Sequence, residues 1–212
     1  MTKKIMIIIL CVFCVAVIVA SAVLGPIAVR GYKMYRAAVD AVPLKEKIAQ
    51  VQADESYVTA DEIANEYLKR VVEIEDHRFY SHGAFDVISL ARALLTNVAS
   101  GKTAIGGSTI TQQVAKNLYF TQERIYERKV AELLVAFELE RELTKDEILE
   151  LYCNIVYFGE GCYGIKEASM HYFGILPEKL DEHQAVLLVR TLTSPNTNNP
   201  NSNAATQIKR AA

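Results

Sequence analysis

The sequence lacks the short patterns that identify most metal, nucleotide and β-sheet proteins. No cysteine and histidine spacing resembles a zinc site. No Gly-Lys-Ser/Thr follows the glycine pair at 106–107, which excludes a phosphate-binding P-loop. No Asn-Gly or Asp-Gly turn lies between alternating apolar residues, so strand signals are scarce. The net charge of −2 gives no support for a nucleic-acid partner. The length of 212 residues therefore predicts one all-α domain with an anchor.

One apolar run near the N-terminus is long enough to cross a membrane. Residues 5–24 are apolar except for Ser21, and two lysines precede them. About 20 residues at a rise of 1.5 Å span a hydrocarbon core of roughly 30 Å. A cleaved signal peptide is the alternative, since residues 20–22 read Ala-Ser-Ala, but the run exceeds a usual signal core. We therefore expect a retained transmembrane helix.

The charges beside this run favour a cytoplasmic N-terminus, although Arg30, Lys33 and Arg36 weaken the bias. We expect Gly25-Pro26 to end the anchor helix, because proline removes a helix hydrogen bond. The sequence thus predicts a single-pass protein of the plasma membrane with its folded domain on the extracytoplasmic side. The expected division is a cytoplasmic N-terminus at 1–4, an anchor at 5–24, a stalk at 25–55, a folded domain at 56–195 and a polar tail at 196–212.

The folded domain contains several helix-start signals. We expect helices to begin at two capping boxes, Thr59-x-x-Glu62 and Thr144-x-x-Glu147, and at two single capping residues, Asp86 and Thr121. Another helix is expected from about Asp181 to Leu192. A further helix is expected to open after Gly106-Gly107. Two cysteines, Cys153 and Cys162, also lie in this domain. They form either a disulfide or buried free thiols, and we favour the thiols.

Glu75 is the first candidate for chemistry. It follows an apolar stretch and precedes Phe79 and Tyr80. A carboxylate at a helix end, beside apolar and aromatic groups, can have its pKa raised by desolvation and act as a general base. From this feature alone, an ordinary solvated acid is an equally good interpretation. His82 could be a second acid or base, but a structural hydrogen bond is the better interpretation of that side chain.

A basic stripe is expected on a later helix. Glu132 lies one turn beyond Arg128 and Lys129 on the same face, and Arg124 lies one turn before Arg128. A solvent-exposed ion pair would explain one acid and one base. Three cations exceed that need, and a diphosphate could bind them as its charge rises during bond breaking. From position 100 to 130 the chain has five bases and two acids, which also favours an anionic partner.

A polar segment lies between these two features. Ser108, Thr109, Gln112 and Gln113 follow the glycine pair, and Lys116 comes one turn later. Backbone N–H groups at a helix start, beside hydroxyls and amides, suit an anion or a sugar. As an isolated motif this segment would be weak evidence.

Taken in order, the segments resemble the successive motifs of glycosyltransferase family 51, the peptidoglycan glycosyltransferases that occur alone or fused to penicillin-binding domains. The matching segments, within about residues 60–195, are Glu75-Asp76-x-x-Phe79-Tyr80-x-His82, Gly107-Ser108-Thr109-Ile110-Thr111-Gln112-Gln113-x-x-Lys116-Asn117, Arg128-Lys129-x-x-Glu132, Ile148-Leu149-Glu150-x-Tyr152-x-Asn154 with Tyr157-Phe158-Gly159, and Tyr172-Phe173-Gly174. The resemblance implies a lysozyme-like helical fold with a smaller membrane-facing lobe that includes the Leu94 to Ile105 region. No penicillin-binding domain follows, which predicts the monofunctional form.

The resemblance also implies roles for the candidate residues. Glu75 would be the base that deprotonates the 4-hydroxyl of the acceptor sugar, and Glu132 would be a second essential carboxylate near the diphosphate. The implied substrate-binding residues are Ser108, Thr109, Gln112 and Gln113 for sugar and phosphate, and Lys116, Arg124, Arg128 and Lys129 for the diphosphate.

The implied reaction is polymerisation of lipid II into β-1,4-linked glycan strands, with inversion and release of polyprenyl diphosphate, in cell wall biosynthesis. It requires no cofactor, although a divalent cation could assist. The expected partners are lipid II, the growing strand and the plasma membrane, with other wall-synthesis proteins as further candidates. The alternatives are a lysozyme-like glycan-cleaving enzyme and an inactive membrane-anchored scaffold.

Overall fold

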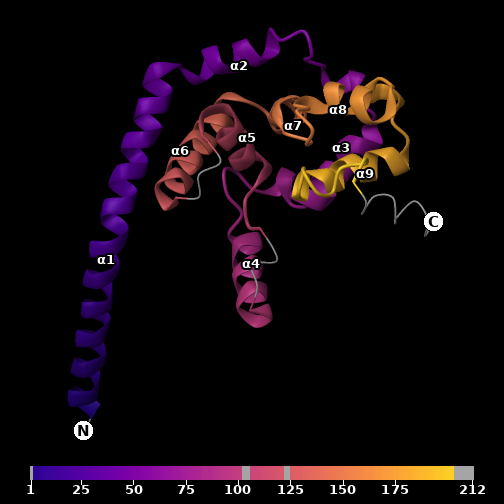
Figure 1. Ribbon diagram of the computed structural model, residues 1–212. Coiled ribbons are helices and arrows are strands. Elements are labelled where there is room, and N and C mark those ends of the chain that lie inside the picture. The colour runs from indigo at the N-terminus through magenta and orange to yellow at the C-terminus, as the bar shows by residue number, and fades with distance from the viewer. Residues whose placement is uncertain (1, 102–105, 122–124, 203–212) are drawn as a thin grey trace.

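The computed structural model describes residues 2–101, 106–121 and 125–202, and this part of the chain is helical (Figure 1). Its α-helices are α1 (Thr2–Ala41), α2 (Leu44–Gln52), α3 (Asn65–Glu75), α4 (Val87–Ser100), α5 (Ile110–Tyr119), α6 (Tyr126–Glu142), α7 (Lys145–Ile155), α8 (Gly164–Phe173) and α9 (Glu182–Thr193). Three short 3-10 turns are η1 (Ala60–Glu62), η2 (Phe79–Ser81) and η3 (Pro177–Lys179). Extended pairing in the described residues is limited to a bridge between Tyr157 and Tyr163. The predicted all-α class is confirmed.

The first helix is longer than expected. α1 continues through Pro26 and ends only at Ala41, so the prediction that Gly25-Pro26 ends the helix is wrong. Within the described residues, the stretch Ile5–Ala41 is long and apolar enough to cross a membrane, and its first part is exposed. Packing against α6 holds the part of α1 after Pro26, and this offsets the hydrogen bond that proline removes.

The contact between α1 and α6 is close. A Cβ atom built on Gly31 would lie 2.5 Å from Cβ of Val130 and 2.7 Å from the Glu127 carbonyl oxygen. Arg30 pairs with Glu127 at 2.8 Å, and the Tyr35 hydroxyl donates to the Glu138 carboxylate. The region expected to be a stalk therefore begins with a helix fixed to the folded body.

Most of the expected helix starts are confirmed. The side chains of Asp86, Thr144 and Asp181 accept hydrogen bonds from backbone N–H groups at the starts of α4, α7 and α9. Gly101 ends α4 with φ of 63°, the left-handed conformation that favours glycine.

Two expected starts differ from the structure. The box at Thr59 caps the short turn η1, and α3 begins later, at Asn65. Thr121 does not cap α6, which begins at Tyr126. The Thr121 carbonyl instead accepts a hydrogen bond from Arg128 at 2.8 Å. Both errors have the same cause. A capping pattern shows where a helix can start, but whether a helix forms there depends on tertiary packing that the pattern does not include.

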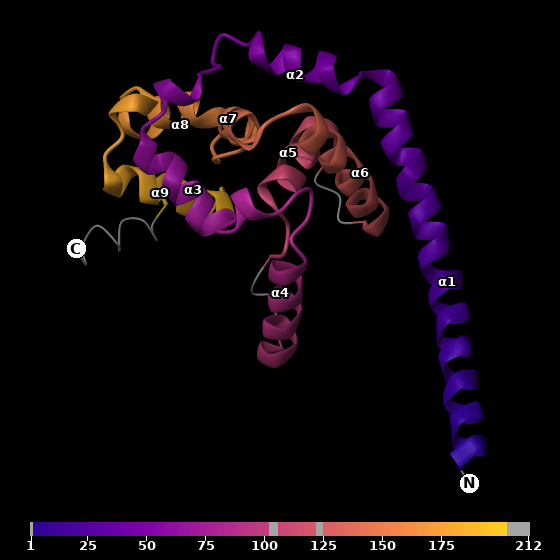
Figure 2. The ribbon, with the colours of Figure 1, turned by 180° about the vertical axis from the view of Figure 1, so that it is seen from behind.

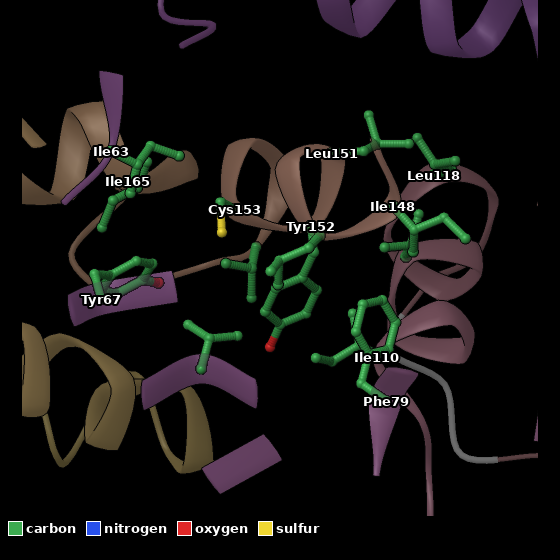
Figure 3. Packing of buried hydrophobic residues seen from close by; sticks show 14 of the residues in the cluster. Ile63, Tyr67, Phe79, Ile110, Leu118, Ile148, Leu151, Tyr152, Cys153 and Ile165 are labelled. Atoms are coloured by element: carbon green, nitrogen blue, oxygen red, sulfur yellow. The ribbon is translucent and has the colours of Figure 1, made fainter. Parts of the chain in front are cut away.

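A cluster of buried apolar side chains holds the body together. Helix α5 packs against both α6 and α7, and α3 packs against α9. Figure 3 shows part of the cluster, where Tyr67 of α3, Ile110 of α5 and Tyr152 of α7 are fully buried. Cys153 and Cys162 are buried free thiols, as the sequence favoured. This packing brings the ends of α3 and α5 together, and the candidate site forms there.

Candidate active site

Glu75 is the last residue of α3 and lies beside α5. Its side chain is half-buried, and one carboxylate oxygen, Oε2, accepts a hydrogen bond of 2.9 Å from Nε2 of Gln113. Burial raises the pKa of the Glu75 carboxyl above its ordinary value, and the charge of Asp76 acts in the same direction. The Gln113 hydrogen bond and the charge of Lys116 oppose this shift without cancelling it. The solvated interpretation therefore does not describe Glu75, and its role as a base stays a prediction.

Asp76, the next residue, forms a hydrogen bond with the first residue of α5. Its buried carboxylate accepts the backbone N–H of Ile110 at 3.1 Å and contacts Nε2 of His82 at 2.8 Å. The other ring nitrogen of His82 lies 2.7 Å from the Gly83 carbonyl oxygen. Both ring nitrogens are thus occupied within the fold, and the structural interpretation of His82 is confirmed.

The basic stripe on α6 surrounds a buried acid. Glu132 is only 1% exposed, and its carboxylate lies 2.7 Å from Nε of Arg128 and 2.5 Å from Nζ of Lys129. The contact with Arg128 has the distance of an ion pair but not the alignment of a hydrogen bond. A carboxylate this deeply buried needs such partners, because desolvation of an unpaired charge is costly. The alternative of a solvent-exposed ion pair is therefore excluded for Glu132.

Lys116 on α5 lies between the two acids. Burial lowers the pKa of its ammonium group. Glu132 and Glu75 both act to raise it, and Lys129 and Arg128 act to lower it. Lys116 is thus affected electrostatically both by Glu75 on α3 and by the charged side chains of α6.

The polar segment before α5 has a mixed role. The Ser108 hydroxyl lies 3.2 Å from Nζ of Lys129 and so faces the cations. Thr109 is buried, accepts from the N–H of Gln112 at 3.2 Å and donates to the Ala84 carbonyl at 3.1 Å. The fold already uses the Thr109 hydroxyl, so its suggested contact with substrate remains a prediction. Gln112 is partly exposed at the start of α5. Arg124 lies outside the described residues.

A cavity of about 120 Å³ opens beside the base. It is lined by Glu75, His77, Arg92 and the backbone of Gly106 and Gly107, together with Ile74, Asp76, Ser89, Ser108 and Thr109. Arg92, on α4, lies 3.4 Å from the His77 ring, and the sequence analysis did not select it. The sequence did contain a signal for Arg92, since it is the one charged residue in the stretch Val87–Ser100.

The described residues contain no group of three or more histidine, cysteine or acidic side chains able to hold a metal ion. A supporting role for a divalent cation therefore remains a prediction with no ligand set assigned to it. A larger cavity of about 650 Å³ lies between α3 and α7, and neither Glu75 nor Glu132 lines it. The candidate site residues with charged side chains that the structure describes therefore lie on α3, α5 and α6.

These features define an all-α enzyme that would bring a carboxylate base to an anionic substrate. The chain belongs to the transglycosylase family, whose match covers residues 43–212. It is 36% identical over 174 residues to the monofunctional glycosyltransferase of Staphylococcus saprophyticus, covering 77% of this chain and 64% of that one. It is 41% identical over 144 residues to penicillin-binding protein 1A of Aquifex aeolicus, covering 68% of this chain and 20% of that one. A Cupriavidus necator protein named as a transglycosylase is 39% identical over 162 residues, covering 76% of this chain and 70% of that one.

Proposed function

We propose that this chain is a peptidoglycan glycosyltransferase that polymerises lipid II into β-1,4-linked glycan strands during cell wall synthesis. The observation that carries the proposal is the half-buried Glu75 carboxylate, with its raised pKa, next to a group of cations on α5 and α6. Membership of the transglycosylase family and the similarity to a monofunctional glycosyltransferase support the same reaction.

In this reaction Glu75 takes the proton from the 4-hydroxyl of the acceptor sugar. The hydroxyl oxygen then attacks the anomeric carbon of the growing strand, and the bond from that carbon to the polyprenyl diphosphate breaks with inversion. A base is most effective when its pKa lies near the working pH, and burial moves the pKa of Glu75 in that direction.

The leaving diphosphate needs positive charge more than it needs a proton. Lys116 and Lys129 lie beside Glu132 and can approach the diphosphate, and Arg128 holds Glu132 from the other side. A glycosidase instead uses one carboxyl group as an acid and a second as a base or nucleophile. Because Glu132 is enclosed by cations, it is poorly placed to donate a proton to a sugar. We propose that it positions the cations that hold the diphosphate, with Ser108, Gln112 and Arg124 as further substrate contacts.

The test is to supply the purified intact chain with lipid II and, separately, with finished peptidoglycan. We expect glycan strands and free polyprenyl diphosphate from lipid II, and no fragments from finished peptidoglycan. Release of fragments without strand synthesis would instead indicate the lysozyme-like alternative. Absence of turnover on both substrates, with a folded protein, would indicate the scaffold.

We also propose that α4 forms the membrane-facing lobe of a single-pass protein whose site lies outside the cytoplasm. In Figures 1 and 2, α4 and the N-terminal part of α1 project from the same side of the body. Several apolar side chains on α4 are exposed, namely Val87, Ile88, Leu90, Leu94, Leu95 and Val98. Such a surface suits a lipid interface. Residues 102–105, the last part of the proposed lobe, lie outside the described residues.

The absence of tryptophan from the chain allows a direct test of this orientation. Leu95 is 71% exposed on α4, and Leu176, between α8 and η3, is 48% exposed. In Figure 1, α8 lies away from the tip of α4. In vesicles containing brominated lipid, we expect strong quenching of tryptophan fluorescence in Leu95→Trp and little in Leu176→Trp. Equal quenching in the two variants would contradict the proposed lobe.

A further inference from the structure

We propose that Tyr152 is a positioning residue for the base and acts on it through the side-chain amide of Gln113. The inference rests on the function proposed above, because it assigns a role relative to Glu75. Tyr152 is on α7, Gln113 on α5 and Glu75 on α3, so the three side chains connect three helices through two hydrogen bonds.

The two hydrogen bonds fix the direction of the amide. The Tyr152 hydroxyl donates to Oε1 of Gln113 at 3.3 Å, and Nε2 of Gln113 donates to Oε2 of Glu75 at 2.9 Å. A reversed amide would place Oε1 against the Glu75 carboxylate, and the buried Tyr152 hydroxyl proton would lose its acceptor. The hydroxyl of Tyr152 thus favours the orientation in which Gln113 offers an N–H to Glu75.

Tyr152 can serve as a permanent donor because it is fully buried (Figure 3). Burial raises the pKa of its hydroxyl well above the ordinary value, and the nearby charge of Glu75 adds to this effect. The proton therefore stays on Tyr152 throughout the pH range in which the enzyme works. Tyr67 gives a natural comparison, since it is equally buried near Glu75 but its hydroxyl has no hydrogen-bond partner among the residues that the structure describes.

Other groups around Glu75 are unchanged by a substitution at Tyr152. The titratable and charged side chains that influence Glu75 or line its cavity are Asp76, Lys116, Tyr67, His77 and Arg92. Loss of the Tyr152 hydroxyl leaves the Gln113 amide free to turn. The carboxylate then loses a hydrogen bond to its charged form, and this raises the pKa of Glu75.

The experiment measures lipid II polymerisation against pH for the intact chain and for Tyr152→Phe. Since Glu75 acts when deprotonated, a higher pKa moves the acid limb of the rate profile to higher pH. We expect a move of roughly half to one pH unit, and a rate about fivefold lower on that limb, as for loss of one neutral hydrogen bond. At pH values well above the limb, the variant should approach the rate of the unmodified chain.

Two further variants separate positioning from simple support of the core. Tyr67→Phe, which removes a buried hydroxyl without a partner, should leave the profile unchanged. Adding Tyr152→Phe to Gln113→Leu should have no further effect on the limb, because the hydroxyl acts through the amide. An unmoved limb in Tyr152→Phe, an equal loss of rate at every pH, or full additivity in the double variant would overturn the inference. Inactivity of the unmodified chain on lipid II would instead overturn the proposed function.

Discussion

Replacing Glu75 with glutamine should reduce lipid II polymerisation by about a thousandfold or more, within the range that general bases contribute. The amide keeps the size of the side chain and can still contact Gln113, but it cannot accept the proton of the attacking hydroxyl. Strand formation from labelled lipid II, followed by gel separation, measures the loss.

The same variant should remain folded. The carboxyl of Glu75 has a raised pKa in the folded chain, so the folded state binds its proton more readily than the unfolded state does. Its ionisation therefore costs stability as the pH rises past the unfolded value, and the neutral amide avoids that cost. At pH 7 the melting temperature of Glu75→Gln should equal or exceed that of the unmodified chain.

Glu73 supplies the matched control on the same helix. Its side chain is 59% exposed and pairs with Arg70 at 3.0 Å. Glu73→Gln should keep its activity, since exposed pairs contribute little. Strand synthesis by a folded Glu75→Gln protein at a rate close to that of the Glu73→Gln control would contradict the role of Glu75 as the base.

Among the proposed substitutions, replacing Glu132 with glutamine should lower the free energy of unfolding most. The carboxylate is 1% exposed and contacts both Arg128 and Lys129, so the amide would leave two neighbouring cations without a counter-charge. Removal of one partner from a buried pair typically costs about 3–5 kcal/mol. For a chain of this size, that corresponds to a fall in melting temperature on the order of 10 °C. Thermal unfolding in detergent, followed by circular dichroism, measures it.

Glu142, at the end of the same helix, is the control for this prediction. It pairs with Lys45 at 3.1 Å, and the side chain of Lys45 is 81% exposed. Glu142→Gln should leave the melting temperature almost unchanged, because solvent-exposed ion pairs contribute little to stability. Equal stability in Glu132→Gln and Glu142→Gln would show that burial of Glu132 does not depend on its charge.

The parts of the fold that the sequence predicted are those set by neighbouring residues. The capping box at Thr144 and the caps at Asp86 and Asp181 depend on residues only two or three positions away. The candidate base was also found locally, as an acid between apolar and aromatic residues. The order of the motifs then gave the second acid and the cations before any geometry was known.

The parts that the sequence could not predict depend on distant packing. Glu132 fits a solvated helix face by its spacing, and its burial depends on tertiary packing such as that of α5 against α6. The passage of α1 through Pro26 has the same origin, because α6 supports the residues beyond the proline. The link from Tyr152 to Gln113 joins residues 39 positions apart, and no local pattern connects them.

In the membrane orientation proposed above, the contact at Gly31 would set the depth at which the substrate is handled. If the edge of the hydrocarbon core lies at Leu24, as proposed, seven further residues of continuous helix place Gly31 roughly 10 Å above it. The head-group layer on one side of a bilayer is about 5–8 Å thick. Helix α6, which touches Gly31 through Val130 and carries the cations, therefore begins just above the lipid phosphates. Under the proposed function and orientation, a polyprenyl-linked diphosphate would reach these cations while its chain remains in the bilayer, and the enzyme would not need to extract its substrate.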